Sequence, residues 1–384
     1  MRGGVRGGVA IAGVAESDLG QVAPGMSPVD LMAQATSRAL ADCGLTLADV
    51  DGIFCASAQA RFGPMVLAEY LGLRPRYFDG TQIGGSSFMS HLAHAQLALE
   101  AGLCNVALIA YGSTQRTVSR SAASPPDPHP YEQPFRPMLP VSAYALAAGR
   151  HMHEFGTTRE QLAQVAVAAR QWALLNPAAW EKEPLTLEQV LGARMVSWPL
   201  TVRDCCLLLD GGGAMIVTST ARAKTLRKPL VTVLGVGESL GHNSISGMRD
   251  LTTTAARESG RDAFARAGLQ PADVKMLSLY DAFTITPILF LEDLGFCEKG
   301  EGGPFVSDGA IAPGGSLAVN TNGGGLSYCH PGMYGLLAMI EAVRQVRGEC
   351  GARQVANCDV ALAHGNGGVL SSQCTVLFGG AATL

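Results

Sequence analysis

The sequence predicts an α/β protein made of two related halves. Short apolar strands alternate with helical stretches, two segments of the first half recur in the second, and the chain is long for a single core. Hydrophobic cores stop growing at about 250 to 300 residues, whereas this chain has 384 residues. We therefore expect two core units.

The internal duplication is visible at two places. Residues 9–20, VAIAGVAESDLG, resemble residues 231–242, VTVLGVGESLGH, and share a glycine, a valine, a glutamate and a serine. Residues 41–57 resemble residues 265–281, in the same order along the chain. Two collinear matches make chance repetition improbable.

A looser correspondence completes the repeat. Gly84 and Gly85 precede an apolar helical stretch and a strand at 106–109, and glycines at 323–325 precede a helical stretch and a strand at 360–363. Each half therefore follows the order strand, helix, strand, glycine turn, helix, strand.

This order places the division of the chain near residue 222. We predict an N-terminal half at 1–222 and a C-terminal half at 223–384. Helices are expected to be sandwiched between two mixed, mainly parallel sheets, because helical crossovers connect parallel strands. Uninterrupted apolar strands such as VALIA are typical of sheets that are buried on both faces.

A long insertion at about residues 113–205 has no counterpart in the second half. Seven prolines fall between Ser121 and Pro140, and these favour extended and turn geometry. Helical periodicity returns at 141–173, with a helix start at 157–160. An insertion of this size is a candidate lid or substrate-contacting region.

Charge and cysteine usage exclude several classes of protein. A net charge of −4 and a pI of about 6.1 give no electrostatic footprint for nucleic acid or an anionic membrane surface. Ten cysteines without a Cys-x-x-Cys pair indicate reduced thiols in a cytoplasmic protein. The apolar run at 92–112 contains Glu100, so it predicts a buried helix and strand rather than a membrane span. The apolar stretch before Glu16 is too short for a signal peptide.

Four glycine-rich or polar turns stand at predicted strand ends or helix starts, at residues 84–87, 280–283, 320–335 and 363–368. Ligands of parallel α/β sheets bind outside the strand ends, and backbone N–H groups at helix starts can hold an anion or oxyanion. We expect the duplication to bring the turns of both halves near one another.

These candidates also have structural interpretations. Residues 84–87 can form a tight turn with a serine cap, Tyr280 can be a buried tyrosine with a bonded hydroxyl, and His364 can be a core histidine. His91 and His94 are expected to be packed on a helix, so no metal site is predicted. The chain lacks the glycine fingerprint of a Rossmann domain, a P-loop and the Gly-x-Ser-x-Gly motif of serine hydrolases.

Together these motifs resemble the thiolase superfamily, and within it the sterol-carrier-protein thiolases and their bacterial relatives. The resemblance covers GGSSFMSHLAHAQLALEAGLCNVALI from Gly84, GTTREQLA from Gly156, DGGGAMIV from Asp210, YDAFT from Tyr280, NTNGGGLSYCHPGMYG from Asn320 and HGNGG from His364. It implies the thiolase fold with its inserted loop domain, an acyl-CoA substrate and a homodimer.

The family's nucleophilic cysteine is missing. The resemblance places it at or beside Gly84 or Gly85, so the route through an acyl-cysteine is expected to be closed. Ser86 or Ser87 is the alternative nucleophile, although a hydroxyl needs a well-placed base. Tyr280 stands where relatives hold a water or thioester oxygen, and its phenol can donate a hydrogen bond, or transfer a proton if its pKa is lowered.

The resemblance also implies a set of catalytic and binding residues. His330 corresponds to the histidine of the family's Gly-His-Pro motif and is the strongest catalytic candidate. His364 stands where sterol-carrier-type members carry a histidine, which makes it a candidate acid or base at the α-carbon. Tyr328 or Tyr334 can supply a second phenol, with Tyr328 preferred. Contacts to coenzyme A, as part of the substrate and with no bound cofactor, are expected from Gly84, Gly85, Ser86, Asn322, Gly324 and Gly365.

The favoured function is the making or breaking of a carbon–carbon bond at the α-carbon of an acyl-CoA thioester. Tyr280, His330 and His364 provide acid, base and donor groups for retro-aldol cleavage of a 3-hydroxyacyl-CoA, or its reverse. Two alternatives are Claisen-type acyl transfer through Ser86 or Ser87 and a non-catalytic platform subunit. Superfamily members that lack the cysteine act as side-chain-cleaving aldolases, usually with a small zinc-ribbon/OB-fold partner, so such a partner is implied. The acyl group stays open.

Overall fold

The computed structural model describes residues 6–118 and 129–384. Within these ranges, ten strands form one mixed sheet in the order β10-β9-β11-β12-β8-β1-β7-β4-β2-β3, beside a small sheet of β5 and β6.

The N-terminal half contains β1 (Val9–Glu16), α1 (Pro28–Cys43), β2 (Gly52–Cys55), α2 (Gly63–Leu71), β3 (Tyr77–Asp79), α3 (Ser87–Glu100), β4 (Val106–Ser113) and β7 (Gly211–Ser219). The insertion contains α5 (Val141–Phe155), α6 (Arg159–Leu174), α7 (Leu187–Leu191), β5 (Met195–Ser197) and β6 (Leu200–Thr201). After α8 (Thr220–Ala223), the C-terminal half contains β8 (Val231–Leu240), α9 (Ala256–Ala267), β9 (Met276–Leu279), α10 (Ile285–Asp293), α11 (Gly302–Phe305), β10 (Ala318–Val319), α12 (Gly335–Arg347), β11 (Val360–Gly367) and β12 (Ser372–Gly380).

The sheet is symmetric about the junction between β1 and β8. Outward from this junction, one half runs β1, β7, β4, β2, β3 and the other runs β8, β12, β11, β9, β10. Corresponding strands therefore occupy corresponding places, and the duplicated α/β architecture predicted from the sequence is confirmed. The proposed division at residue 222 falls in α8 and stays a prediction.

The strand pairing corrects one detail of the expected architecture. The halves are joined into one sheet by an antiparallel contact between Ala10 and Thr232, instead of forming two separate sheets. The pairs β2–β3, β2–β4, β9–β10 and β9–β11 are parallel, whereas β7 and β12 pair antiparallel with their neighbours. The reason is that β12 follows β11 through a hairpin, and β7 follows an insertion whose helices α5 and α6 pack against α10 instead of forming a crossover on a face of the sheet.

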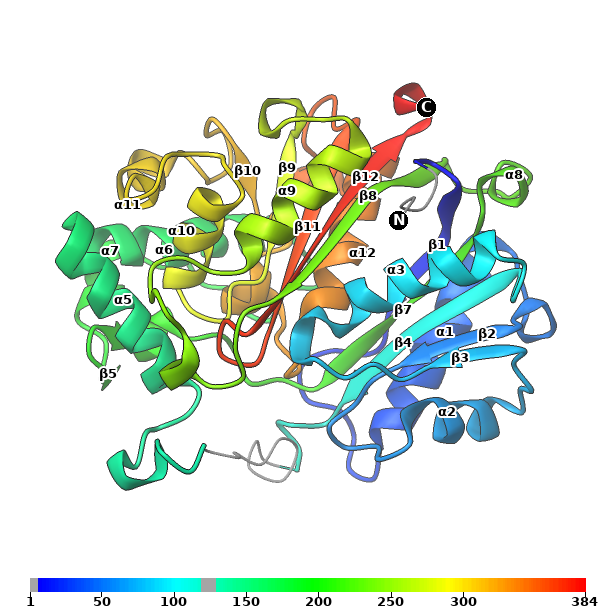
Figure 1. Cartoon of the computed structure of the whole chain (residues 1–384), viewed down its shortest axis with the longest axis horizontal. Helices are drawn as coiled ribbons and strands as arrows, with labels where there is room; N and C mark the ends of the chain where they lie inside the picture. Colours follow the sequence, from blue (N-terminus) through cyan, green and yellow to red (C-terminus); the bar gives the residue numbers. More distant parts are fainter. Residues whose placement is uncertain (1–5, 119–128) are drawn as a thin grey trace.

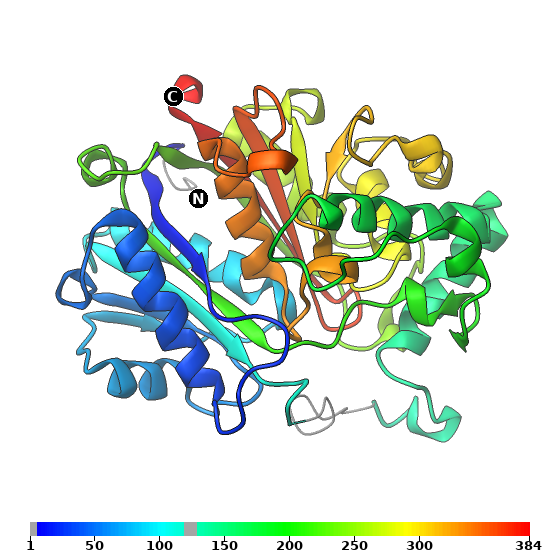
Figure 2. The same cartoon turned by 180° about the vertical axis from the view of Figure 1, so that it is seen from behind.

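Helices cover the strands in layers. In Figure 1, α3 lies in front of the N-terminal strands and α9 in front of the C-terminal strands, and the reverse view in Figure 2 brings α1 and α12 forward. Both α3 and α12 contact strands of both halves and also contact each other, whereas α1 and α9 each pack on their own half. The predicted helices between the halves are thus α3 and α12.

The duplicated segments pack in the same way in both halves. A Cβ built on Gly13 would stand 2.1 Å from Ala39 O of α1, and one on Gly235 would stand 2.3 Å from Ala263 O of α9. The shared glycine therefore lets the first strand of each half approach its outer helix closely. Both outer helices end at a glycine in the left-handed region, at Gly44 and Gly268.

The insertion forms a helical layer at one end of the molecule, where α5 and α6 pack against α10 (Figure 1). The predicted helix start is confirmed, since Thr158 caps α6 in a capping box with Gln161. Residues 129–140 contain no α-helix, as the prolines predicted. The prolines at 125–128 lie outside the described residues.

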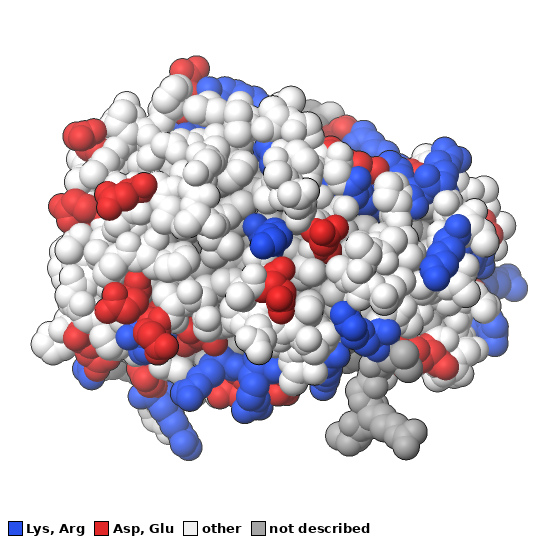
Figure 3. Space-filling view, turned by 90° about the horizontal axis from the view of Figure 1, so that it is seen from above, with Lys and Arg blue, Asp and Glu red and all other residues white. Residues whose placement is uncertain are grey.

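The run at 92–112 comprises the end of α3 and most of β4, as predicted. Among the described residues, no helix combines the length and the apolarity that crossing a membrane requires. On the face presented in Figure 3, basic and acidic side chains are interspersed around broad uncharged areas.

Candidate functional site

Tyr280 and His330 form a hydrogen-bonded pair where the two halves meet. Tyr280 directly follows β9, and its backbone N–H donates to His364 O at 3.0 Å. Its hydroxyl oxygen accepts from Tyr334 N–H at 3.2 Å, lies 3.1 Å from His330 Nε2 and lies 3.2 Å from Gly332 O. A phenol has one proton, so Tyr280 donates either to Gly332 O or to His330. The hydroxyl proton of Tyr280 thus has two acceptors within reach, Gly332 O and His330 Nε2.

The pair is buried. Tyr280 is 4% exposed and His330 is 6% exposed. Burial raises the pKa of Tyr280 well above its ordinary value. We expected Tyr280 to transfer a proton if its pKa were lowered, whereas its pKa is raised. Tyr280 is therefore a neutral phenol that donates a hydrogen bond and gives up its proton only to a stronger base than a phenolate.

A second tyrosine, which the sequence analysis missed, holds the turn after His330. Tyr111, at the end of β4, donates to Pro331 O at 2.5 Å and accepts from Met333 N–H at 3.1 Å. Gln115 Nε2 donates to His330 O at 2.7 Å. Residues of the N-terminal half thus fix the backbone at His330 and directly after it. The sequence did offer one indication of this role, since Tyr111 is a tyrosine near the end of an otherwise apolar, buried strand.

The second phenol beside the pair is Tyr334. Its ring is perpendicular to that of Tyr280, at 5.7 Å between centroids, and stacked with that of His330 at 6.3 Å. Its hydroxyl donates to Asn322 Oδ1 at 2.9 Å.

Tyr328 is engaged elsewhere. Its hydroxyl donates to Glu16 Oε1 at 3.0 Å, and Glu16 forms a two-point ion pair with Arg344. The structure does not place this hydroxyl beside His330, so our preference for Tyr328 over Tyr334 was wrong. Its partner Glu16 is 312 residues away in the sequence, so no local pattern could predict this contact.

Asp281 anchors the glycine turn that leads to His330. Its carboxylate accepts from Gly325 N–H at 2.6 Å and from Leu326 N–H at 3.2 Å. A Cβ on Gly324 would stand 2.0 Å from the same carboxylate. Burial raises the pKa of Asp281 to about 7. The sequence analysis passed over Asp281, although an acid directly after a buried strand is a signal of such a role.

The glycine turns of the two halves meet, as expected. A Cβ on Gly85 would stand 2.2 Å from Tyr280 Cε2, and one on Gly335 would stand 2.1 Å from Gly85 O. Gly84 has a φ of +78°, and its Cβ would stand 2.7 Å from Gly367 Cα. Neither Gly84 nor Gly85 has room for a side chain.

Ser86 and Ser87 have structural partners. Ser87 Oγ donates to Gly84 O at 2.6 Å and accepts from Ile83 N–H at 2.9 Å. Ser86 Oγ bonds Ser372 Oγ at 2.6 Å and Ile83 O at 3.2 Å. These partners are backbone groups and a hydroxyl, so they supply no base for a nucleophile.

The structure does not bring the side chain of His364 to the pair. Its Nδ1 lies 2.9 Å from Thr375 Oγ1 and its Nε2 lies 2.9 Å from Gln373 Oε1, and its ring packs edge-on against Phe290 of α10. The next residue, Gly365, faces the other way, toward Ser86. Burial lowers the pKa of His364 to about 3. His364 therefore does not fit the expected role of acid or base at the α-carbon.

The remaining predicted binding residues lie around these turns. Asn322 Oδ1 accepts from Gly324 N–H at 2.8 Å as well as from Tyr334. Contacts of Asn322, Gly324 and Gly365 with coenzyme A stay predictions.

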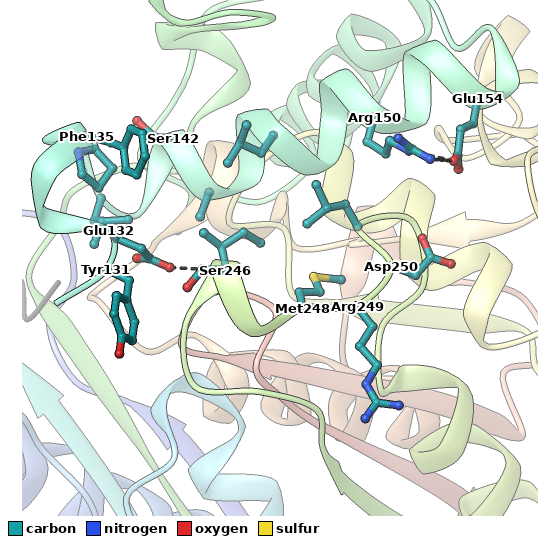
Figure 4. Close-up of a pocket in the computed structure, with 16 residues that line it drawn as sticks. Tyr131, Glu132, Phe135, Ser142, Arg150, Glu154, Ser246, Met248, Arg249 and Asp250 are labelled. Carbon is teal, nitrogen blue, oxygen red and sulfur yellow. Dashed lines mark hydrogen bonds and ion pairs between the residues drawn. The ribbon is translucent and has the colours of Figure 1, made fainter. Parts of the chain in front are cut away.

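A cavity of 620 Å³ opens between the insertion and the C-terminal half. Figure 4 shows α5 along one side and the 245–251 loop along the other. Ser246 N–H donates to Glu132 Oε1 at 2.9 Å and ties the two sides together at one end. The lining residues are Tyr131, Glu132, Phe135, Pro137, Leu139, Ser142, Ala143, Leu146, Arg150, Glu154, Ile245, Ser246, Met248, Arg249, Asp250 and Leu251. The cavity is thus mostly apolar, with charged groups at its margin.

His91 and His94 are packed, as expected. His91 Nε2 lies 3.0 Å from Thr81 O, and His94 bonds Asp79. Among the described residues, no cluster of His, Cys, Asp and Glu is suited to a metal ion, and all ten cysteines are free thiols.

Comparison with known proteins identifies the family. Residues 237–380 match the family described as thiolase C-terminal domain-like. The chain is 32% identical over 364 residues to a steroid side-chain-cleaving aldolase of Thermomonospora curvata, covering 89% of this chain and 91% of the relative. It is 32% identical over 381 residues to an acetyl-CoA acetyltransferase of Methanothermobacter thermautotrophicus, covering 96% and 99%. The structure of an Ltp2-ChsH2(DUF35) aldolase superposes with a TM-score of 0.89 at 30% identity and covers 98% of both chains. The chain belongs to the thiolase superfamily, in its sterol-carrier-protein thiolase-like branch.

Proposed function

We propose that this protein catalyses retro-aldol cleavage, or the reverse aldol addition, between the α- and β-carbons of a 3-hydroxyacyl-CoA. The observation that carries the proposal is the position of Tyr280. Its ring fills the space in which a side chain on Gly85 would begin, so the site has no room for the acyl-cysteine of a thiolase. The two aldolases among the similar proteins support the same reaction.

The reaction needs a base, an acid and a donor for an enolate. A base takes the proton of the β-hydroxyl, the bond between the α- and β-carbons breaks, and the β-carbon becomes a ketone or aldehyde. The electron pair of that bond forms the enolate of a shorter acyl-CoA, which takes up one proton at its α-carbon. One proton leaves oxygen and one reaches carbon, so free coenzyme A is neither consumed nor released.

The Tyr280–His330 pair fits this proton balance. His330 accepts the β-hydroxyl proton through its imidazole, and Tyr280 donates its phenolic proton toward the enolate. The 3.1 Å contact between His330 Nε2 and the Tyr280 hydroxyl then returns the proton to Tyr280. Because the pKa of Tyr280 is raised, the phenol starts the cycle protonated, as a proton donor must.

The alternative functions have less support. Acyl transfer through Ser86 or Ser87 needs a base beside the hydroxyl, whereas these serines bond Gly84 O, Ile83 and Ser372. A non-catalytic platform has no need for a buried, hydrogen-bonded tyrosine–histidine pair.

The cavity between α5 and the 245–251 loop supports a bulky, mostly apolar acyl group or the arm of coenzyme A as its occupant. Ala143 lines the cavity, and the adjacent Tyr144 reaches inward to Asn366. Asn366 O in turn lies 2.6 Å from the Cβ position on Gly85. The helix that lines the cavity therefore also contacts the strand beside the pair.

The proposal includes two protein partners. Apolar side chains project from α2, β3 and α3, and 38 to 67% of each is exposed: Phe62, Met65, Val66, Phe78 and Leu97. β3 is the outermost strand of its half, so a second copy of the chain can pair with it. The similar structure is that of an Ltp2-ChsH2(DUF35) aldolase, and its second component supports the expected zinc-ribbon/OB-fold partner.

The test is a product assay on the full chain, with and without such a partner encoded beside it. A 3-hydroxyacyl-CoA should yield a shorter acyl-CoA and a ketone or aldehyde, detected by mass spectrometry, with no change in free coenzyme A. Tyr280→Phe should lower kcat/KM of the reaction by about 10²- to 10⁴-fold, and Tyr70→Phe, which removes a hydroxyl on α2 that bonds Asp30, should retain the reaction. Acylated Ser86 or Ser87 with a 3-ketoacyl-CoA would establish acyl transfer instead. Partner binding without turnover of either substrate would establish the platform.

A further inference from the structure

We propose that Tyr144 is a positioning residue for the Tyr280–His330 pair. We also propose that His364, acting through Gln373 and Asn366, determines which acceptor the hydroxyl proton of Tyr144 points to. The inference rests on the proposed aldolase function and assigns the insertion a part in it.

Tyr144 joins the insertion to the turn that carries Tyr280. It belongs to α5 and is 2% exposed. Its ring packs against Phe283, with 4.4 Å between centroids. Its hydroxyl accepts from Asn366 Nδ2 at 2.7 Å and donates to Gly368 O at 3.2 Å. The Tyr144 hydroxyl therefore holds the end of β11 to α5.

A buried chain of hydrogen bonds runs from this hydroxyl into the core. Gln373 Nε2 donates to Asn366 Oδ1 at 2.9 Å, and Gln373 Oε1 lies 2.9 Å from His364 Nε2. His364 Nδ1 lies 2.9 Å from Thr375 Oγ1. Asn366, Gln373, His364 and Thr375 are each at most 2% exposed. Water therefore has little access to replace a lost bond.

The chain has a direction, because each amide donates at one end and accepts at the other. With Asn366 donating to Tyr144, Gln373 presents its oxygen to His364, which must then carry its proton on Nε2. The Tyr144 proton is left to point at Gly368 O. If His364 carried its proton on Nδ1 instead, both amides would have to turn over, and Tyr144 would donate to Asn366.

The same strand holds the catalytic groups. His364 O accepts the backbone N–H of Tyr280 at 3.0 Å, and Asn366 O lies against Gly85. Removing the Tyr144 hydroxyl leaves a buried N–H of Asn366 without an acceptor unless the amide turns. Turning the amide would break its bond from Gln373, so either response loosens the end of β11, whose Asn366 O lies 2.6 Å from the Cβ position on Gly85. Misplacement of catalytic groups lowers kcat more than it weakens substrate binding.

The first test is Tyr144→Phe in the full chain, which keeps the ring on Phe283, with Tyr70→Phe as the matched control. With a 3-hydroxyacyl-CoA, we expect kcat of Tyr144→Phe to fall at least about tenfold with little change in KM. The control should keep both constants. A Tyr144→Phe variant with the wild-type kcat, or with a changed KM alone, would overturn the proposal.

The second test compares His364→Gln with His364→Leu. A glutamine amide can donate to Gln373 in place of Nε2–H, whereas leucine keeps only the packing against Phe290. Glutamine should rescue most of kcat. Leucine should lower kcat as Tyr144→Phe does, and the double variant Tyr144→Phe/His364→Leu should lose no more than either single variant. Equal activity of the two His364 variants, or additive losses, would contradict a relay.

A third readout does not depend on turnover. Nitrogen NMR of the histidine rings, with His364 assigned through the His364→Gln variant, should find its proton on Nε2 and a changed signal in Tyr144→Phe. If the wild-type protein fails to cleave any 3-hydroxyacyl-CoA, the proposed function falls, while this signal still decides whether the relay exists. An unchanged His364 signal would overturn the relay whatever the activity.

Discussion

A Cβ added to Gly85 would stand 2.2 Å from Cε2 of Tyr280 and 2.6 Å from Asn366 O. The tyrosine ring and a side chain at position 85 are therefore mutually exclusive. The absence of a cysteine at this site and the presence of the Tyr280 ring are therefore linked, because both cannot occupy the same space. Restoring the cysteine alone would displace the ring instead of restoring a thiolase.

Gly85→Ala tests this relationship. The methyl group should lower stability by roughly 1–3 kcal/mol, because overpacking forces the ring or the strand to move, and turnover should fall with it. The control is Gly149→Ala in α5, where the nearest atom to the new Cβ is Trp198 Cζ3 at 3.5 Å. That change should raise stability by up to about 1 kcal/mol. Urea unfolding and product assays check both, and a fully active, undisturbed Gly85→Ala protein would refute the exclusion.

The Tyr280–His330 pair should behave as one unit. Tyr280→Phe and His330→Gln should each lower kcat/KM by about 10²- to 10⁴-fold, as expected for the loss of an acid–base group. The kcat/KM of the double variant should be no lower than that of the less active single variant. Steady-state kinetics of the four proteins decide this. Multiplied losses would mean that the two residues act in separate steps.

His364 should make stability depend on pH. Burial lowers its pKa to about 3, whereas an unfolded histidine has a pKa near 6.5. The unfolded state therefore binds the proton first, so stability should fall as the pH drops from about 6.5 toward 3, by at most about 1.4 kcal/mol per pH unit. Urea unfolding between about pH 7.5 and 5 should give a shallower decline for His364→Gln than for the wild type. Parallel declines would show that the buried imidazole is not responsible.

The exposed face of α2 and β3 should hold two copies of the chain together. Phe78 is 64% exposed on the outermost strand of its half. Phe78→Lys should yield a monomer, because a charged side chain on a sheet edge opposes pairing. Sedimentation velocity checks the mass. Leu384→Lys, at a second exposed apolar position (55%) on another part of the surface, is the control and should keep the wild-type mass.

The features that local sequence determines were predictable. The repeat predicted matching halves because Gly13 and Gly235 meet the same need for close strand–helix packing. The start of α6 followed from Thr158, whose capping partner is three residues away. The meeting of the glycine turns followed from the symmetry of the halves.

The side-chain roles were harder to predict because they depend on distant partners. Tyr328 bonds Glu16, which lies 312 residues earlier, and no local pattern connects the two. For His364, the alternation of β11 was informative in principle, since glycines 365 and 367 already occupy the face toward Ile83, Ser86 and Met89. Asp281 and Tyr111 were missed because their partners are backbone atoms of a turn whose path the sequence does not give.

The contacts that assemble the site join the two ends of the chain. Tyr111 and Pro331 are separated by 220 residues, and Glu16 and Arg344 by 328. Contacts of such separation form slowly, because the entropy of closing the intervening loop is lost before they give any stabilisation. During folding, each half can acquire its helices and strands early, but the site exists only once both halves have docked through α3 and α12. A newly made chain is therefore inactive until β11 and β12 have been synthesised and packed.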